Sequence, residues 1–273
     1  MAILERAYAK LNLTLGVLLR RADGYHELDS LMQSVDLYDR VLVEKSRKVE
    51  IYVTGASLPF ENTMYLAASR YKALTGCGAI VRCEKRIPAE AGLGGGSADA
   101  AAVLRGLQKL HRMASDQELT KIALSVGADV PFCLYGGLAR CQGIGELLTP
   151  FAAKEPLHFV LAKPPVGVST RTLFEALPLP RPRAQTHAAM RELAQGDAAS
   201  LAPFLSNALE SAAVELVPEI GQYKERLLAA GALAAVMTGS GSAVFGLFAD
   251  EESAKSAETA LADLHWVQYC SAV

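Results

Sequence analysis

The residues best suited to chemistry lie in a glycine-rich segment, Pro88 to Ala102, which reads PAEAGLGGGSADAAA. Ser97 follows its last glycine and opens an alanine-rich stretch that favours a helix. Residues without Cβ let the backbone wrap closely around a ligand, and the N–H groups of a first helical turn attract anions. The segment predicts a phosphate-binding loop.

Two better-known loops are excluded by spacing. A Walker A loop ends in Gly-Lys-Ser/Thr, which does not occur in this sequence. A dinucleotide fingerprint counted from Gly92 requires glycine where Ser97 stands, and no acidic residue closes a clear second strand about twenty residues further on. A merely flexible loop is the remaining alternative, but glycines at positions 92, 94, 95 and 96 are hard to explain by packing alone.

A second group of candidates lies on a predicted strand, Ala7 to Leu15. Apolar and polar residues alternate there, so that Lys10 and Asn12 share the polar face. The pattern predicts a half-buried strand whose polar face is available for chemistry. A solvated lysine and a surface amide are the alternatives left open.

Asp129 lies in the sequence GADVPF, after Gly127 and before Pro131. This position predicts a carboxylate held at a helix or turn terminus, where capping and solvation are alternatives to catalysis.

Tyr25 and His26 follow an Asp23-Gly24 turn. An exposed aromatic ring beside an imidazole suits a flat heterocycle, although a turn dipeptide is the simpler interpretation.

Composition narrows the function classes. The chain has 273 residues, 51% of them hydrophobic, and a formal net charge of −2, which argues against nucleic acid as the main partner. No signal-type or membrane-spanning apolar run occurs, so we expect a cytoplasmic protein without a membrane partner. The five cysteines lack metal or redox spacing and are expected to be reduced thiols.

The elements that must position these residues alternate between strands and helices. In the first half, strands are expected at Leu31–Val35, Arg40–Glu44, Glu50–Val53 and Ala79–Cys83. Helices are expected from the Asn62 cap to about Leu74, from Ser97 to His111, and from the Ser115 capping box to Gly127.

The second half predicts a strand at Leu157–Ala162, then helical stretches with a Pro/Arg-rich loop at Pro178–Arg183 between them. Strands at Leu233–Met237 and Ala243–Phe248, a helix at Glu251–Leu264 and a strand at Trp266–Cys270 complete a β-α-β-β-α-β order, typical of a ferredoxin-like unit. We place a domain boundary near Pro150 to Pro156.

The glycine loop resembles that of the GHMP superfamily of small-molecule kinases. The resemblance extends over nearly the whole chain through the blocks AKLNLTLGV, RADGYHEL, ENT, PAEAGLGGGSADAAA, GADVPF, GVSTRTLF and TGSGSAVF. Their order resembles the members that phosphorylate a cytidine-diphosphate-linked methylerythritol in the non-mevalonate isoprenoid pathway, and DGYHEL is the most specific block.

The resemblance implies an α+β, two-domain fold. It comprises an N-terminal nucleotide-binding α/β domain of the ribosomal protein S5 domain 2-like type, residues 1–152, and a C-terminal ferredoxin-like domain, residues 153–273. It also implies ATP and Mg²⁺ as cofactors and a small-molecule substrate. Asp129 would be the base that takes the proton from the substrate hydroxyl. Lys10 would orient Asp129, keep it ionised and steady the transferring phosphate.

The resemblance also implies the binding residues. Tyr25 would stack on cytosine and His26 would hydrogen-bond it, while Phe174, which could equally be helix core, would close the other face. The remaining substrate residues would be Asn12, Thr170 (also a plausible helix cap), Gly239 and Ser240. Gly239-Ser240-Gly241-Ser242 is expected to be both a hairpin turn and a phosphate contact.

For the nucleotide, Asn62 and Thr63 would contact adenine. Lys85 could approach the phosphates, although a surface strand-end lysine is the favoured interpretation. The loop itself would contribute Pro88, Gly92, Leu93, Gly94, Gly95, Gly96 and Ser97. We assign no side chain as a metal ligand.

The sequence departs from the family pattern at two positions. Ala98 stands where the loop normally has a second serine, so Ser97 must supply any hydroxyl contact to phosphate or to metal-bound water. Ala208 replaces the aspartate of an Asn-Asp-Leu-Glu motif and is expected to affect local helix structure more than chemistry. We still expect an active enzyme.

Three other functions are alternatives to a kinase for a cytidylated substrate. Another GHMP kinase, for mevalonate, homoserine or a sugar, would not need Tyr25 and His26, because those substrates lack a nucleobase. A non-catalytic nucleotide-binding regulator would not need both Lys10 and Asp129. A dehydrogenase is disfavoured by the loop spacing. We expect a monomer or weak homodimer.

Overall fold

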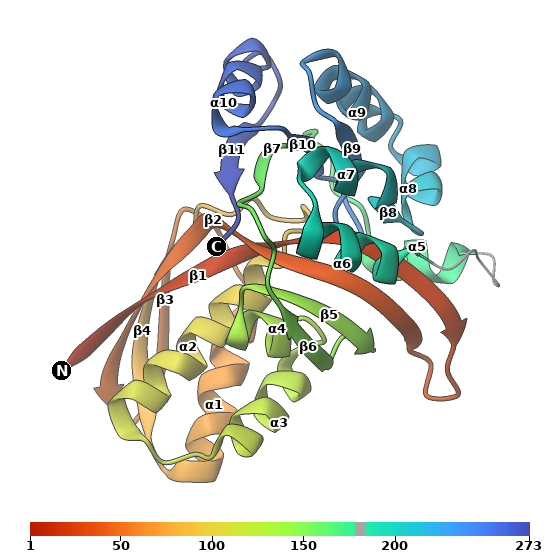
Figure 1. The fold of residues 1–273 in the computed structure, drawn as a ribbon. Helices are drawn as coiled ribbons and strands as arrows, with labels where there is room; N and C mark the ends of the chain where they lie inside the picture. The colour runs from red at the N-terminus through yellow and green to blue at the C-terminus, as the bar shows by residue number, and fades with distance from the viewer. Residues whose placement is uncertain (178–183) are drawn as a thin grey trace. The chain divides into compact units, whose positions relative to one another are not determined.

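The computed structural model describes residues 1–177 and 184–273, so the predicted loop at Pro178–Arg183 lies outside the described residues. Contacts divide the chain into two compact units (Figure 1). The first unit comprises Met1–Lys10, Leu37–Pro88 and Gly94–Gly136; the second comprises Leu11–Asp36, Ala89–Leu93 and Gly137–Val273.

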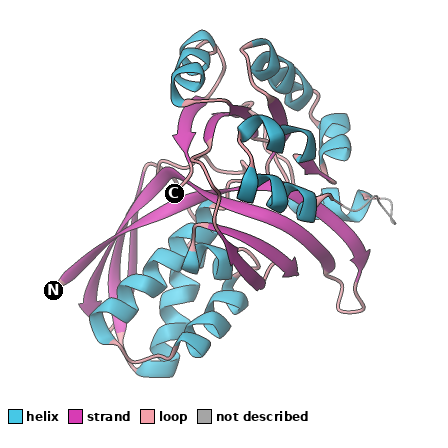
Figure 2. Cartoon of the chain, viewed as in Figure 1, coloured by secondary structure: helices cyan, strands magenta, loops and turns pink. Residues whose placement is uncertain are grey.

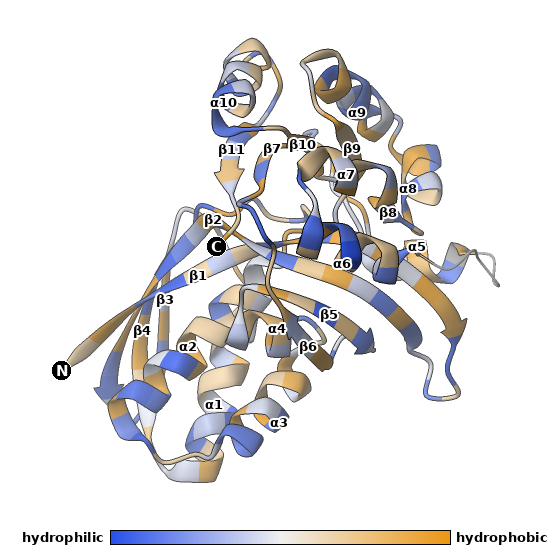
Figure 3. Cartoon of the chain, viewed as in Figure 1, coloured by the Kyte–Doolittle hydropathy of each residue, from blue (hydrophilic) through white to orange (hydrophobic). Residues whose placement is uncertain are grey.

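Two long strands, β1 (Ala2–Arg20) and β2 (His26–Ser46), contribute residues to both units. Polar and apolar residues alternate along parts of both (Figure 3). The prediction of a half-buried first strand is wrong, because Lys10, Asn12 and Thr14 are 3%, 1% and 0% exposed. The predicted strands at Leu31–Val35 and Arg40–Glu44 are one strand, since no glycine or proline interrupts β2 between them.

The first unit builds its part of the sheet from β3 (Val49–Thr54), β4 (Gly78–Glu84) and segments of β2 and β1, in that order. β3 runs parallel to β4, and β4 runs antiparallel to β2. Four helices gather beside these strands (Figure 2): α1 (Thr63–Thr75), α2 (Gly95–His111), α3 (Asp116–Val126) and α4 (Val130–Tyr135). A Cβ at Gly106 would lie 2.6 Å from Val43 Cγ2, so glycine lets α2 approach β2 closely.

The helix signals of the first unit are confirmed. Asn62 Oδ1 accepts hydrogen bonds from the N–H groups of Met64 and Tyr65 at the start of α1. Ser115 and Glu118 form the predicted capping box of α3, and Gly127 is the C-cap of this helix. α2 begins at Gly95 rather than at Ser97.

The second unit contains β5 (Leu138–Gly143), which pairs antiparallel with β2 and with β6 (Leu147–Phe151). A short strand, β8 (Ser206–Asn207), runs parallel to β1, with Thr14 opposite Ser206. β5, β6 and the short helix α4 were not predicted from the sequence.

The second unit also holds a separate four-stranded sheet in the order β11-β7-β10-β9. Its strands are β7 (His158–Ala162), β9 (Ala234–Met237), β10 (Val244–Phe248) and β11 (Val267–Ser271), all antiparallel to their neighbours. This strand order confirms the predicted ferredoxin-like unit. An apolar core that includes Val160, Met237 and Phe248 packs between this sheet and its helices.

The helices of the second unit are α5 (Thr170–Ala176), α6 (Thr186–Gln195), α7 (Ala198–Leu201), α8 (Glu210–Leu216), α9 (Glu219–Ala229) and α10 (Glu251–Ala260), with a 3₁₀ turn at Ala202–Phe204. α10 ends at Ala260, before the predicted Leu264. The five cysteines, all within the described residues, form no disulfide bonds. Among the described residues, every helix is too short or too polar to cross a lipid bilayer.

Candidate active site

Lys10 and Asp129 form an ion pair in the first unit, with Lys10 Nζ 3.4 Å from Asp129 Oδ2. The Lys10 side chain is 4% exposed and that of Asp129 is 30% exposed. Asp129 stands at the N-cap position of α4, but its side chain makes no capping hydrogen bond. The capping interpretation is therefore wrong, and the carboxylate faces a buried ammonium while keeping access to solvent.

Gly94 lies directly over Lys10. A Cβ at Gly94, where φ is +70°, would stand 2.9 Å from Lys10 Cγ and 3.1 Å from its Cε. Any side chain there would displace the lysine stem, and the left-handed backbone conformation would strain a non-glycine residue. The glycine loop and the buried ammonium are thus adjacent because position 94 has no side chain.

The first turn of α2 presents the N–H groups of Gly95, Gly96 and Ser97, which have no partner within the helix by its geometry. Gly96 is exposed and Ser97 is half-buried. Thr63 Oγ1 donates a hydrogen bond to the Gly96 carbonyl at 2.6 Å, so the structure brings the start of α1 to this turn. Asn62, which caps α1, lies next to Thr63 in the chain. The arrangement can bind an anion at the helix N-terminus.

Lys85 is not the surface lysine that the sequence favoured. Its Nζ forms ion pairs with Asp39 and with Asp99, the latter at 2.6 Å, and its side chain is 10% exposed. A Cβ at Gly95 would lie 3.5 Å from this Nζ, so the ammonium sits under the start of α2. Asp39 and Asp99 were not predicted as site residues, because their pairing with Lys85 depends on the tertiary contact of β2 and α2.

Burial dominates the electrostatics of this cluster. Burial and the charge of Asp39 raise the pKa of Asp99 to about 7, against the opposing effect of Lys85. Burial alone would lower the pKa of Lys85, but the two carboxylates raise it above its usual range. Burial and the Asp99 charge also raise the pKa of the Cys83 thiol. Two carboxylates and one ammonium would leave one negative charge, and the raised pKa of Asp99 favours a proton on that carboxyl, which neutralises the cluster.

The first part of the glycine loop packs within the second unit. The N–H groups of Ser242 and Ala243 donate to the carbonyls of Glu90 and Ala91. A Cβ at Gly92 would collide with the Thr238 carbonyl and lie 2.9 Å from the Gly241 nitrogen, so only glycine fits there. Of the other predicted loop residues, Leu93 is buried, which leaves its backbone for binding, and Pro88 is half-buried.

Ser240 lies in the turn between β9 and β10, where its hydroxyl and that of Thr170 are 2.7 Å apart. The predicted hairpin is confirmed, because β9 and β10 pair antiparallel on either side of the turn. Thr170 is not the cap of α5; Ser169 is, and its hydroxyl accepts from the Thr172 N–H. The structure therefore brings together Thr170 and Ser240, which come from distant parts of the sequence.

His26 contacts Phe174 in the second unit, with ring centroids 4.8 Å apart and planes inclined by 33°. Phe174 also packs against the apolar core, so the interpretation of that residue as helix core is confirmed. Tyr25 is 58% exposed beyond the Asp23-Gly24 turn. Burial and the Arg20 charge lower the pKa of His26, which keeps its imidazole neutral near pH 7. These rings can hold a planar heterocycle.

Asn12 lies deep in the second unit, 1% exposed. Its backbone N–H donates to Thr238 Oγ1 at 3.1 Å, and its side-chain Nδ2 donates to Ser30 Oγ at 2.8 Å. The interpretation of Asn12 as a surface amide is wrong. Its amide is part of a buried network beside the turn that carries Ser240.

Family models match two segments of the chain. The GHMP kinase N-terminal domain matches residues 62–137, and the GHMP kinase C-terminal domain matches residues 189–266. A 4-diphosphocytidyl-2-C-methyl-D-erythritol kinase from Caldicellulosiruptor saccharolyticus is 45% identical over 92% of this chain and 90% of that protein. A kinase of the same name from Pelotomaculum thermopropionicum is 46% identical over 93% of this chain and 92% of its own length. The chain belongs to the 4-diphosphocytidyl-2-C-methyl-D-erythritol kinase family of GHMP kinases.

A crystal structure of a 4-(cytidine 5'-diphospho)-2C-methyl-D-erythritol kinase matches with a TM-score of 0.86 and 38% identity, over 99% of each chain. A homoserine kinase from Cytophaga hutchinsonii, 22% identical with a TM-score of 0.78, shares the fold. The predicted α+β GHMP kinase fold is confirmed. As a GHMP kinase, the chain uses ATP.

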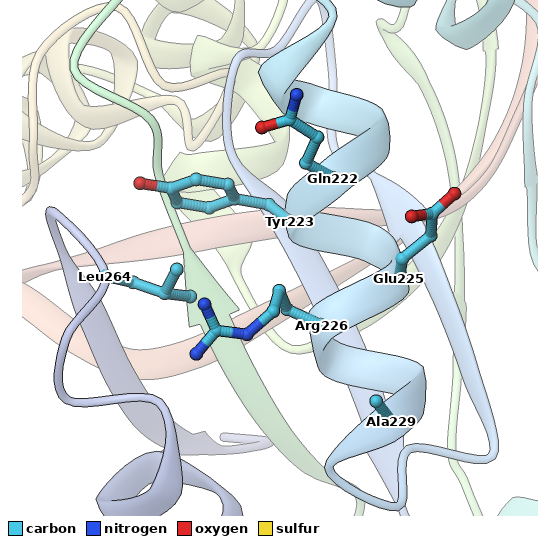
Figure 4. Close-up of a pocket in the computed structure, with 6 residues that line it drawn as sticks. All are labelled: Gln222, Tyr223, Glu225, Arg226, Ala229 and Leu264. Carbon is cyan, nitrogen blue, oxygen red and sulfur yellow. The ribbon is translucent and has the colours of Figure 1, made fainter.

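A shallow cavity of about 340 Å³ lies elsewhere in the second unit. Tyr223 and Arg226 extend from α9 toward Leu264, as Figure 4 shows, and none of the predicted site residues lines it. Within residues 1–177 and 184–273, no group of three His, Cys, Asp or Glu side chains could hold a metal ion.

Proposed function

We propose that this chain transfers the γ-phosphate of ATP to the 2-hydroxyl of 4-diphosphocytidyl-2-C-methyl-D-erythritol. The products are the 2-phosphate and ADP, in the non-mevalonate route to isoprenoid precursors. The Lys10–Asp129 pair beside the glycine loop is the observation that carries the proposal. Relatives of that name, aligned over more than nine-tenths of the chain, support the choice of substrate.

Asp129 acts as the general base. Its partly exposed carboxylate takes the proton from the 2-hydroxyl while that oxygen bonds to the γ-phosphorus and the bond to the β-phosphate oxygen breaks. Lys10 pairs with the carboxylate, orients it and counters negative charge on the transferring group. ADP leaves with the electron pair, and Asp129 returns its proton to solvent.

The glycine loop and the start of α2 bind the nucleotide phosphates, with Thr63 fixing the turn at Gly96 and Asn62 beside adenine. Mg²⁺ suits this arrangement, because it is bound mainly by phosphate oxygens and water and needs few protein ligands. The half-buried Ser97 hydroxyl would hydrogen-bond a phosphate oxygen or a magnesium-bound water. The Lys85 ammonium, which lies next to Gly95 and pairs with Asp39 and Asp99, contributes positive charge near the phosphates.

The second unit carries the residues for the cytidylated substrate. Tyr25 and Phe174 enclose cytosine, and the neutral imidazole of His26 hydrogen-bonds its polar edge. Asn12, Thr170 and the Gly239-Ser240 turn bind the diphosphate and erythritol portions.

The remaining expectations belong to the same proposal. Residues 1–152 form the nucleotide-binding domain, which also contributes Asn12, Tyr25 and His26 to the substrate, and residues 153–273 form the substrate-binding domain. The enzyme works in the cytoplasm as a monomer or weak homodimer, without a nucleic-acid or membrane partner.

Asp129→Asn tests the mechanism, because it keeps the size of the side chain and removes the base. We expect kcat to fall about 10²- to 10⁴-fold, with the KM values for both substrates changing little. Asp116→Asn is the matched control, an exposed aspartate of the same unit that no proposed step uses. ADP release and the mass of the phosphorylated product are followed together. Wild-type turnover by Asp129→Asn would remove Asp129 from the mechanism.

A further inference from the structure

The outer edge of β9 carries an unexplained set of side-chain contacts. β9 is the terminal strand of the four-stranded sheet, so one side of its backbone has no neighbouring strand in that sheet. The N–H and C=O of Met237 point to this side, since the next residue, Thr238, bonds inward to Ala243. Both groups of Met237 need partners from elsewhere.

Asn207 supplies one of these partners. Its Nδ2 donates to the carbonyl of Met237 at 2.8 Å and to the carbonyl of Gly239 at 2.8 Å, and its Oδ1 accepts from the Leu209 N–H at 2.9 Å. Both amide protons and the amide oxygen are engaged, so the side chain has a single orientation. One amide group thus bridges the end of β9 and the first glycine of the turn.

Glu210 supplies the other partner. Its Oε2 accepts from the Met237 N–H at 2.7 Å, while its Oε1 is paired with Lys224 on α9. Asn207 ends β8 and Glu210 begins α8, so the short connection between them spaces both side chains along the same edge. They are the first and last residues of the Asn-Ala-Leu-Glu motif, and both bind β9 or its turn.

We propose that Asn207 is a positioning residue for the substrate-binding turn at Gly239-Ser240. This inference rests on the proposed function and adds a residue outside the expected site. Asn207 holds the Gly239 carbonyl, which fixes the backbone that carries Ser240 opposite Thr170. Glu210 fixes the strand before the turn through Met237.

The hydrogen bond from Asn207 to the Gly239 carbonyl should affect binding of the cytidylated substrate more than binding of ATP. The glycine loop is held to the far side of the turn by Ser242 and Ala243, through bonds that do not involve Asn207. Loss of Asn207 therefore loosens Gly239 and Ser240 while those bonds remain. The KM for the cytidylated substrate should rise, and the KM for ATP should change little.

Two variants test this. Asn207→Asp keeps the shape but sets a carboxylate oxygen against two carbonyls, and Asn207→Ala removes the bridge without adding charge. Loss of two hydrogen bonds predicts a rise of about tenfold or more in the KM for the cytidylated substrate, with the KM for ATP within about twofold. Gln222→Glu is the control, because it makes the same amide-to-carboxylate change at an exposed site and should leave both values unchanged.

The KM split separates positioning from structural support. A residue that only stabilised the fold would lower the melting temperature and the active fraction, leaving both KM values as in wild type, and that result would overturn the inference. Should Asn207→Asp fail to fold, Asn207→Ala gives the same comparison. Absence of cytidylated-substrate turnover in the wild type would instead refute the proposed function, while a wild-type KM in folded Asn207→Ala refutes only the role of Asn207.

Discussion

Replacing Asp99 with asparagine tests the buried Asp39–Lys85–Asp99 cluster through the pH dependence of stability. Asp99 is 1% exposed, and burial together with Asp39 raises its pKa from 3.8 to about 7. Between about pH 4 and pH 7 the unfolded chain has lost this proton while the folded chain keeps it. The favourable contribution of the Asp99 proton to the free energy of unfolding is therefore present at low pH and is lost as the pH rises toward 7.

The size of this change in the free energy of unfolding follows from the shift in the pKa of Asp99. About three pKa units, at roughly 1.36 kcal/mol each, give an upper value of about 4 kcal/mol over this window. Asp99→Asn cannot titrate and leaves the Lys85–Asp39 pair neutral. The free energy of unfolding of the variant, minus that of the wild type, should therefore rise with pH by about 2–4 kcal/mol and level off above pH 7.

Urea unfolding at half-unit pH intervals measures this difference. Any constant effect of the substitution cancels, because only the change with pH is used. Asp116→Asn is again the control, because Asp116 is an exposed aspartate outside this cluster. A difference that does not change with pH, or that falls as pH rises, would show that Asp99 is ionised in the native protein and refute the argument.

Two further substitutions test the site geometry. Gly94→Ala places a Cβ 2.9 Å from Lys10 Cγ at a φ of +70°, so we expect kcat/KM to fall at least about 10²-fold, measured by ADP release; near-normal activity would show that the loop need not approach Lys10 so closely. Phe174→Ala removes the ring that contacts His26, so the KM for the cytidylated substrate should rise at least about tenfold, and an unchanged KM would remove Phe174 from the cytosine site.

The helix and strand order of the second unit was predictable from sequence because its signals are local. β7, β9 and β10 are short, mainly apolar runs, and turn residues and helices separate them from one another and from β11, which gives the ferredoxin-like order directly. α4 was missed because its six residues are almost uniformly apolar and show no helical period. The continuity of β2 was missed because its polar residues at 36 and 39 resemble a break.

The site was less predictable wherever a property depends on tertiary contact. Alternation along β1 identified Lys10 and Asn12 as sharing a face, but it could not show that this face is buried. Nothing near Lys85 in the sequence identifies Asp39 on β2 as its partner, so the surface interpretation followed from local statistics alone. Ala98 is also buried, so a serine there would place its hydroxyl among packed groups.

The central claim is that the chain phosphorylates a cytidylated substrate. The most direct test incubates the purified protein with ATP, Mg²⁺ and either 4-diphosphocytidyl-2-C-methyl-D-erythritol or its inosine counterpart, and compares kcat/KM from ADP release. The His26–Phe174 contact predicts a preference for the cytidine compound of at least about 10²-fold, with phosphate added to the 2-hydroxyl. Equal rates with the two compounds, or ADP release with no phosphorylated product, would contradict the account.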